Sequence, residues 1–168
     1  MPDQPEIEDG LRTKIRQWLE AEGWRVETRA VEESRARWAL QGVDPGGKLV
    51  LFAQDLRRPE VLVLQAGVTI DPNHTQRLSA LDRREQEEFC WDLRFRLLDM
   101  GVNFGGIQVP LEAVGLIERL YVEDMGRNRF FESVGRLQNA ILAVIWMIRR
   151  RLDQPAPADD YRAGLSVN

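Results

Sequence analysis

Apolar residues at the start of the chain change from helical to alternating spacing. Within Asp9–Glu22 the large apolar side chains form one stripe, made of Leu11, Ile15, Trp18 and Leu19, which predicts a helix with one face on a core. Asp9 is a suitable N-cap for it and Gly23 a suitable stop. From Trp24 to Ala30 apolar or small residues alternate with charged ones, which is typical of a half-buried strand.

Three further runs of apolar residues predict strands. Ala36–Val43 and Lys48–Gln54 flank Asp44-Pro45-Gly46-Gly47, which is a strong turn signal, so they predict a hairpin. Val61–Ile70 is a longer and mostly apolar run. Parallel strands would need long crossovers, and these short connections do not provide them. We therefore expect an antiparallel sheet.

Two helix-start signals open the second half of the chain. Asp71 stands before Pro72, as an N-cap before a first-turn proline. Asp82 and Glu85 have the spacing of a capping box. The elements expected from here on are a helix over Asp82–Met100 that ends at Gly101, strands over Val102–Val109 and Val114–Glu123, and a last helix from Asp124 or Asn128 to about Leu152.

The order of elements is helix, three or four strands, helix, two strands, helix. Strands grouped in this way, without regular alternation with helices, indicate an α+β fold. We predict an antiparallel sheet of five to six strands with helices packed on it, in a single domain over residues 1–152. Residues 153–168 contain two prolines and few large apolar side chains, so we expect a flexible C-terminal tail.

Two helices carry more apolar surface than a helix on a sheet needs. In the helix over Asp82–Met100 one stripe consists of Phe89, Cys90, Leu93, Leu97 and Met100, and a second consists of Trp91, Phe95 and Leu98. The last helix is apolar all round from Ala140 to Ile148. We name Trp91, Phe95, Leu98, Leu142 and Trp146 as a dimer or partner interface. The alternative is that other helices or the tail cover these side chains within the monomer.

The composition is that of a soluble globular protein. Of 168 residues 43% are hydrophobic and 30% charged, with a net charge of −4, which excludes general disorder. The acidic excess argues against nucleic-acid binding, because phosphate affinity needs excess Lys and Arg. No apolar run approaches the roughly 20 residues that cross a bilayer. We expect a cytoplasmic protein without a membrane or nucleic-acid partner.

Few residues offer chemistry. The only cysteine, Cys90, stands between two aromatic residues and is expected to be buried and inert. Glu85, Glu88 and Asp92 share one helix face and could hold a divalent cation. The other interpretation is a solvated face in which Arg84 and Arg96 pair with these carboxylates at helical spacing. No glycine-rich phosphate loop occurs, so we expect no cofactor, no metal and no catalytic residue.

The order of elements is similar to the type III secretion chaperone-like (Tir chaperone-like) fold, an antiparallel sheet with helices on one face. Glu85–Gly101 (EQEEFCWDLRFRLLDMG) with Val102-Asn103-Phe104, and Ala143–Trp146 in the last helix, resemble a small uncharacterised family that shares this fold. The resemblance covers about residues 7–152. It implies a homodimer and, for the chaperone branch, binding of an extended partner segment. It implies no activity.

Three functions therefore compete. The first is a small dimeric, non-catalytic, chaperone-like module that binds an extended protein segment, for which an exposed strand edge is one docking mode. The second is a structural oligomer subunit without a client. The third is a metal-dependent enzyme that uses the three carboxylates. We favour the first, because the surplus apolar helix surface and the resemblance both support it.

Overall fold

Six antiparallel strands form one sheet, in the order β1-β2-β3-β4-β6-β5, in the computed structural model, which describes residues 4–30 and 36–153. In chain order the elements are α1 (Gln4–Ala21), β1 (Arg25–Arg29), β2 (Ala36–Val43), β3 (Leu49–Asp55), β4 (Val61–Thr69), α2 (Pro72–Ser79), α3 (Arg83–Asp99), β5 (Asn103–Gly105), β6 (Ala113–Tyr121) and α4 (Arg127–Asp153). The α+β class, the antiparallel sheet and the order of elements are confirmed. The predicted tail lies outside the described residues, apart from Asp153.

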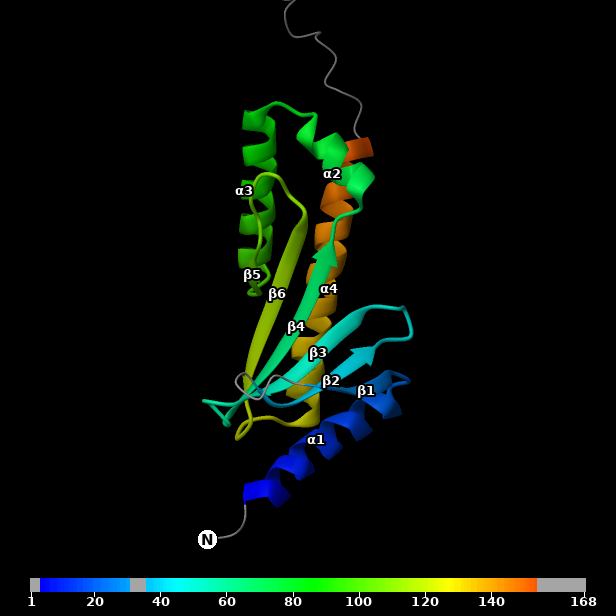
Figure 1. Cartoon of the computed structure of the whole chain (residues 1–168), viewed down its shortest axis with the longest axis vertical. Coiled ribbons are helices and arrows are strands. Elements are labelled where there is room, and N and C mark those ends of the chain that lie inside the picture. Colours follow the sequence, from blue (N-terminus) through cyan, green and yellow to red (C-terminus); the bar gives the residue numbers. More distant parts are fainter. Residues whose placement is uncertain (1–3, 31–35, 154–168) are drawn as a thin grey trace, which may run out of the picture.

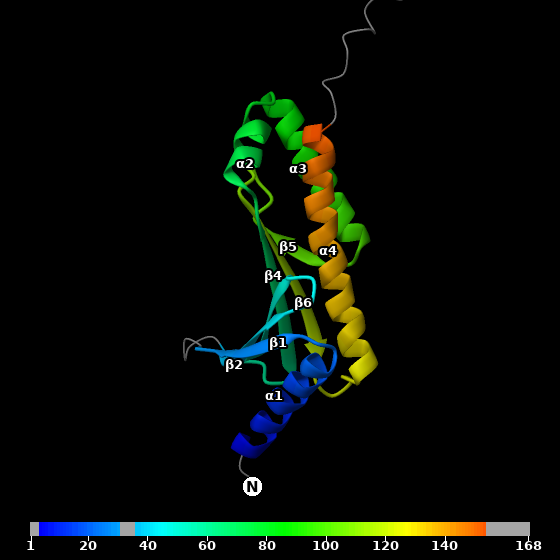
Figure 2. The ribbon, with the colours of Figure 1, turned by 90° about the vertical axis from the view of Figure 1, so that its right-hand side faces the viewer.

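One face of the sheet carries the helices and the core. Alternate residues of the central strands are buried on this face, as Leu62, Leu64 and Ala66 of β4 illustrate, while the residues between them point to the opposite face. The helices α3 and α4 lie on the same side of the sheet, α4 along its length and α3 beside it (Figures 1 and 2). We call this the helical face and the other the open face, which no helix of the described ranges covers.

Local sequence signals set the helix ends. Asp71 caps α2 and accepts a hydrogen bond from the Asn73 amide at 2.8 Å. Asp82 and Glu85 form the predicted capping box at the start of α3. The helix ends at Asp99, and Gly101, two residues later, has a φ of +68°, which no other residue type adopts as readily.

An aromatic cluster joins α1 to α4 at one end of the core. Phe130 of α4 lies 5.5 Å from Trp18 of α1 and 5.6 Å from Phe52 of β3, measured between ring centroids. Further along α4, Gln138 donates to the buried carboxylate of Asp44 at 2.6 Å. The last helix is thereby fixed to the sheet over its N-terminal half.

The strand predicted over Val102–Val109 is much shorter in the structure than expected. The strand β5 has three residues and pairs only with Gly115–Ile117 of β6. It stops because Gly106 adopts a φ of +78°, and a Cβ at this position would lie 2.9 Å from the carbonyl oxygen of Ala113. The chain then leaves the sheet as a loop.

None of the helices within residues 4–30 and 36–153 is long and apolar enough to cross a membrane.

Candidate interaction surface on the helical face

The second apolar stripe of α3 points away from the sheet. Trp91, Phe95 and Leu98 are 54%, 58% and 66% exposed, and we call these three residues the α3 ridge. The first stripe of the same helix is buried, including Leu93 and Leu97, neither of which is accessible to solvent. The helix therefore supports the core with one side and presents large apolar groups with the other.

Neighbouring side chains hold the ridge in place. The rings of Trp91 and Phe95 lie 5.8 Å apart, inclined by 30°. The Arg94 guanidinium lies 4.6 Å from the centre of the Trp91 ring and donates to the carbonyl of Ile107. The contact between the two rings and the cation–π contact restrict the orientation of the Trp91 side chain.

The last helix presents a second exposed tryptophan. Trp146 is 61% exposed and Leu142 is half-buried, whereas Ile141, Val144 and Ile148 are buried against the sheet. One side of the all-apolar run is therefore packed in the core, and the other side points outward on the helical face. All five residues named from the sequence as an interface lie at least partly exposed within the described chain.

A groove separates the two helices. Its cavity measures about 580 Å³, and it is lined by Arg96 and Met100 of α3 and by Asn139, Leu142, Ala143, Trp146, Met147 and Arg150 of α4. We call it the α3–α4 groove. None of the ridge residues lines it, so the ridge and the groove are separate parts of one helical face.

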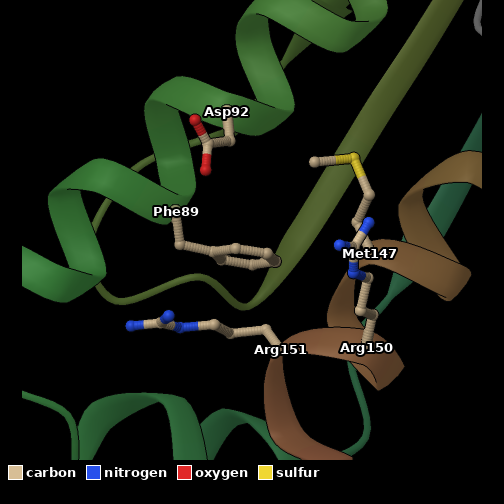
Figure 3. A pocket seen from close by; sticks show the side chains of 5 residues that line it. All are labelled: Phe89, Asp92, Met147, Arg150 and Arg151. Atoms are coloured by element: carbon tan, nitrogen blue, oxygen red, sulfur yellow. The ribbon is translucent and has the colours of Figure 1, made fainter. Parts of the chain in front are cut away.

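A smaller cavity of about 280 Å³ continues towards the C-terminal end of α4 (Figure 3). Phe89 and Asp92 of α3 face Met147, Arg150 and Arg151 of α4 across it. Glu85 accepts a hydrogen bond from the Arg151 guanidinium at 3.1 Å and forms an ion pair with it. The two cavities adjoin each other, since Met147 and Arg150 line both of them.

The groove has a positive edge. Arg96 and Arg150, which both line it, make no ion pair or hydrogen bond with their guanidinium groups within the described residues. Asp92, which lines the smaller cavity, likewise has no ionic partner there. Two unpaired guanidinium groups beside methionine and tryptophan suit a ligand that is both apolar and acidic.

The carboxylates considered as a cation site have other roles. Glu88 pairs with Arg84 at 2.9 Å, as the spacing predicts, and Glu85 caps the helix and pairs with Arg151. Asp92 does not pair with Arg96. Over residues 4–30 and 36–153, no three His, Cys, Asp or Glu residues gather as metal ligands.

Cys90 lies on the buried side of α3 and is 3% exposed. Burial raises the pKa of its thiol, and the positive charge of Arg94 offsets this only in part. A thiol that is both buried and harder to ionise is a poor nucleophile. The expectation of an inert, structural cysteine is consistent with these surroundings.

Two features were not expected from the sequence. One is the groove, since its lining comes from two helices that are distant in sequence and Arg96 was interpreted as an ion-pair partner on its own helix. The other is a row of three glycines, Gly67, Gly115 and Gly105, paired side by side across β4, β6 and β5. Their side-chain positions face the open face, and added Cβ atoms at Gly67 and Gly105 would meet nothing within 4 Å. The row could not be predicted from the sequence, because the pairing of strands that are distant in sequence brings these glycines together.

Comparison with known proteins gives a family and a fold. A model of the family described as "Uncharacterized conserved protein (DUF2299)" matches residues 11–148. A crystal structure of an uncharacterized protein from Methanothermobacter thermautotrophicus superposes with a TM-score of 0.76 at 24% identity, covering 84% of this chain and 98% of that one. No curated protein matches. At this identity the likeness to the solved structure concerns the fold alone.

Proposed function

Because the chain belongs to the DUF2299 family of uncharacterized conserved proteins, we propose a function from the geometry of its helical face: a non-catalytic, chaperone-like binding module. In this proposal two copies associate through the α3 ridge. The α3–α4 groove, with Trp146 and Leu142, binds an extended segment of another protein. The observation that carries the proposal is the exposure of Trp91, Phe95, Leu98 and Trp146 on one face.

Covering these side chains is favourable. Burial of a large apolar side chain contributes about 1.5–3 kcal/mol, and aromatic residues supply a large share of the energy of interfaces. A whole aromatic side chain has an area of about 150–250 Å², so the exposed parts of the three ridge residues amount to roughly 350 Å² per copy. Two copies contribute about 700 Å² through the ridge, and side chains around it supply the remainder of the roughly 1,000 Å² of a specific interface.

A two-fold axis suits the ridge. In a two-fold dimer one patch meets its own copy. Trp91 and Leu98 lie seven residues apart, with Phe95 between them. Two antiparallel α3 helices crossing near Phe95 would place each Trp91 against the Leu98 of the second copy. This arrangement uses all three ridge residues and leaves the α3–α4 groove open.

The test of self-association is the mass in solution. We expect wild-type protein to sediment as a dimer at micromolar concentration, and Phe95→Glu to sediment as a folded monomer. Leu49→Glu is a matched control, because Leu49 is 42% exposed but lies on β3, away from the helical face; this variant should remain a dimer. A wild type that is monomeric at these concentrations would contradict the first half of the proposal.

The test of segment binding uses a permanently unfolded polypeptide, reduced and carboxymethylated α-lactalbumin carrying a fluorophore. We expect saturable binding that Trp146→Glu weakens at least about tenfold, because an aromatic residue central to an interface typically contributes about 2 kcal/mol or more. A dimer that shows no binding of this polypeptide would favour the alternative, a structural subunit without a client.

A further inference from the structure

The α3–α4 groove is positively charged although the chain as a whole is acidic. The net charge is −4, yet Arg96 and Arg150 both line the groove without an ionic partner in the described part of the chain. Met100 and Trp146 contribute apolar surface to the same groove. Among the described residues that line the adjoining cavity, Asp92 alone carries a carboxylate. An occupant that matches this surface carries carboxylates next to apolar side chains.

The chain itself contains such a segment directly after α4. We infer that residues 159–167 of the C-terminal segment dock in the α3–α4 groove, with Asp159 and Asp160 at Arg150 and Arg96. Tyr161, Leu165 and Val167 then follow in the sequence and lie against the apolar part. The charge order matches, because Arg150 is the groove residue nearest to the end of α4 at Asp153.

The connection is long enough for this return. Residues 154–158 separate α4 from the two aspartates and include Pro155 and Pro157. Such a spacer extends about 3.1 Å per residue, or about 15 Å in all. Trp146 precedes Asp153 by seven residues, which is about 10 Å along a helix. The spacer is therefore long enough to bring the two aspartates to the groove. Tyr161, Leu165 and Val167 then extend further along it.

Because the segment is covalently attached to α4, weak contacts are sufficient for it to dock. A segment attached by a short linker acts at an effective concentration in the millimolar range, whereas exposed ion pairs alone contribute at most about 1 kcal/mol each. The docked segment is thus displaced readily by a partner of higher affinity. Its regulatory role rests on the proposed function, because it covers the groove to which a partner segment would bind.

The experiment follows the five tryptophan indole resonances of ¹⁵N-labelled full-length protein, with that of Trp146 assigned by Trp146→Phe. The tail variant Asp159→Lys/Asp160→Lys reverses the attraction to Arg150 and Arg96. We expect it to shift the Trp146 resonance and to leave that of Trp91 unchanged, since Trp91 belongs to the α3 ridge and serves as an internal control. Added salt should shift the wild-type Trp146 resonance in the same direction.

A matched control carries the same change of charge elsewhere. Glu112→Lys/Glu123→Lys replaces two exposed carboxylates outside the groove and should leave the Trp146 resonance in place. The second arm is Leu165→Asp, which removes an apolar contact and should shift Trp146 as the charge reversal does. Docking of this segment would be supported if both tail variants shift the Trp146 resonance in the same way and the control variant does not.

Two results would overturn the inference. One is a Trp146 resonance that is identical in the wild type and both tail variants. The other is a Trp146 resonance that moves only in Phe95→Glu, since a second copy and not the tail would then cover the groove. The mass of each variant in solution is measured in parallel, so failure of tail docking in a protein that remains a dimer is distinguishable from failure of the proposed function.

Discussion

Two leucines on α3 show how strongly the side of a helix decides the role of a residue. Leu93 is fully buried, and Leu98, five residues further on, is 66% exposed. The same residue type thus supports the core at one position and presents apolar surface at the other. Their positions followed from the 100° step per residue, because burial on a sheet repeats with the helical period.

The two leucines provide a matched pair of variants. Leu93→Ala should lower the free energy of unfolding by about 2–5 kcal/mol, because it leaves a cavity in a packed core. Leu98→Ala should change the stability of the monomer by less than about 0.5 kcal/mol, as is usual for surface positions. Urea denaturation, at protein concentrations too low for the dimer to form, measures the free energy of unfolding of both variants. Equal losses would show that the ridge belongs to the monomer's own core.

Cys90 gives a second prediction at the residue scale. Because burial raises the pKa of its thiol, the thiolate fraction at pH 8 is smaller than for a free cysteine, and the reagent has little access. We expect slow reaction with a thiol reagent in the native protein and fast reaction in denaturant. Rapid labelling in the native state would contradict burial and reopen a redox role.

Among the elements, β5 shows where sequence reasoning failed. The pattern predicted a strand of eight residues, and the structure has three. Alternation of apolar residues does not reveal that Gly106 turns into the left-handed region, since this depends on the nearby carbonyl of Ala113. The helices were predicted better because their caps and periodicity are local properties. The α3–α4 groove was missed because it depends on the packing of two helices that are distant in sequence.

Two adjacent glycines test this explanation. Gly106→Ala should lower stability by at least about 1–2 kcal/mol, which is the cost of a left-handed conformation for a residue with a Cβ; the contact with Ala113 adds to it. Gly105→Ala should be nearly neutral, since a Cβ there meets nothing within 4 Å. Thermal unfolding of both variants measures the difference. Similar losses would mean that the turn at Gly106 does not end the strand.

At the scale of the molecule, the helices lie on one side of a sheet whose other face is open. The α+β class and the order of elements could be predicted because strands and helices have different periods. The position of the named interface residues on a single face could not, because it results from the placement of α3 beside α4. The function is harder still to predict from the sequence, since a surface that is suited to binding does not specify its partner.

Removing residues 154–168 tests the domain boundary expected from the sequence. Truncation after Asp153 should change the free energy of unfolding by less than about 1 kcal/mol, because polar terminal segments make few buried contacts. A reversibly docked tail is compatible with this small change. Chemical denaturation of the full-length and truncated proteins measures it, and a larger loss would place the segment in the folded core.

The unbroken last helix has a mechanical consequence. The 27 residues of α4 span about 40 Å, and the helix is anchored to α1 through Phe130, to β6 through Arg136 and Glu118, and to the β2–β3 turn through Gln138. A helix anchored in this way does not bend easily. The groove therefore has one rigid wall, α4, and a change in its width would require movement of α3, which is itself packed on the core through Leu93 and Leu97.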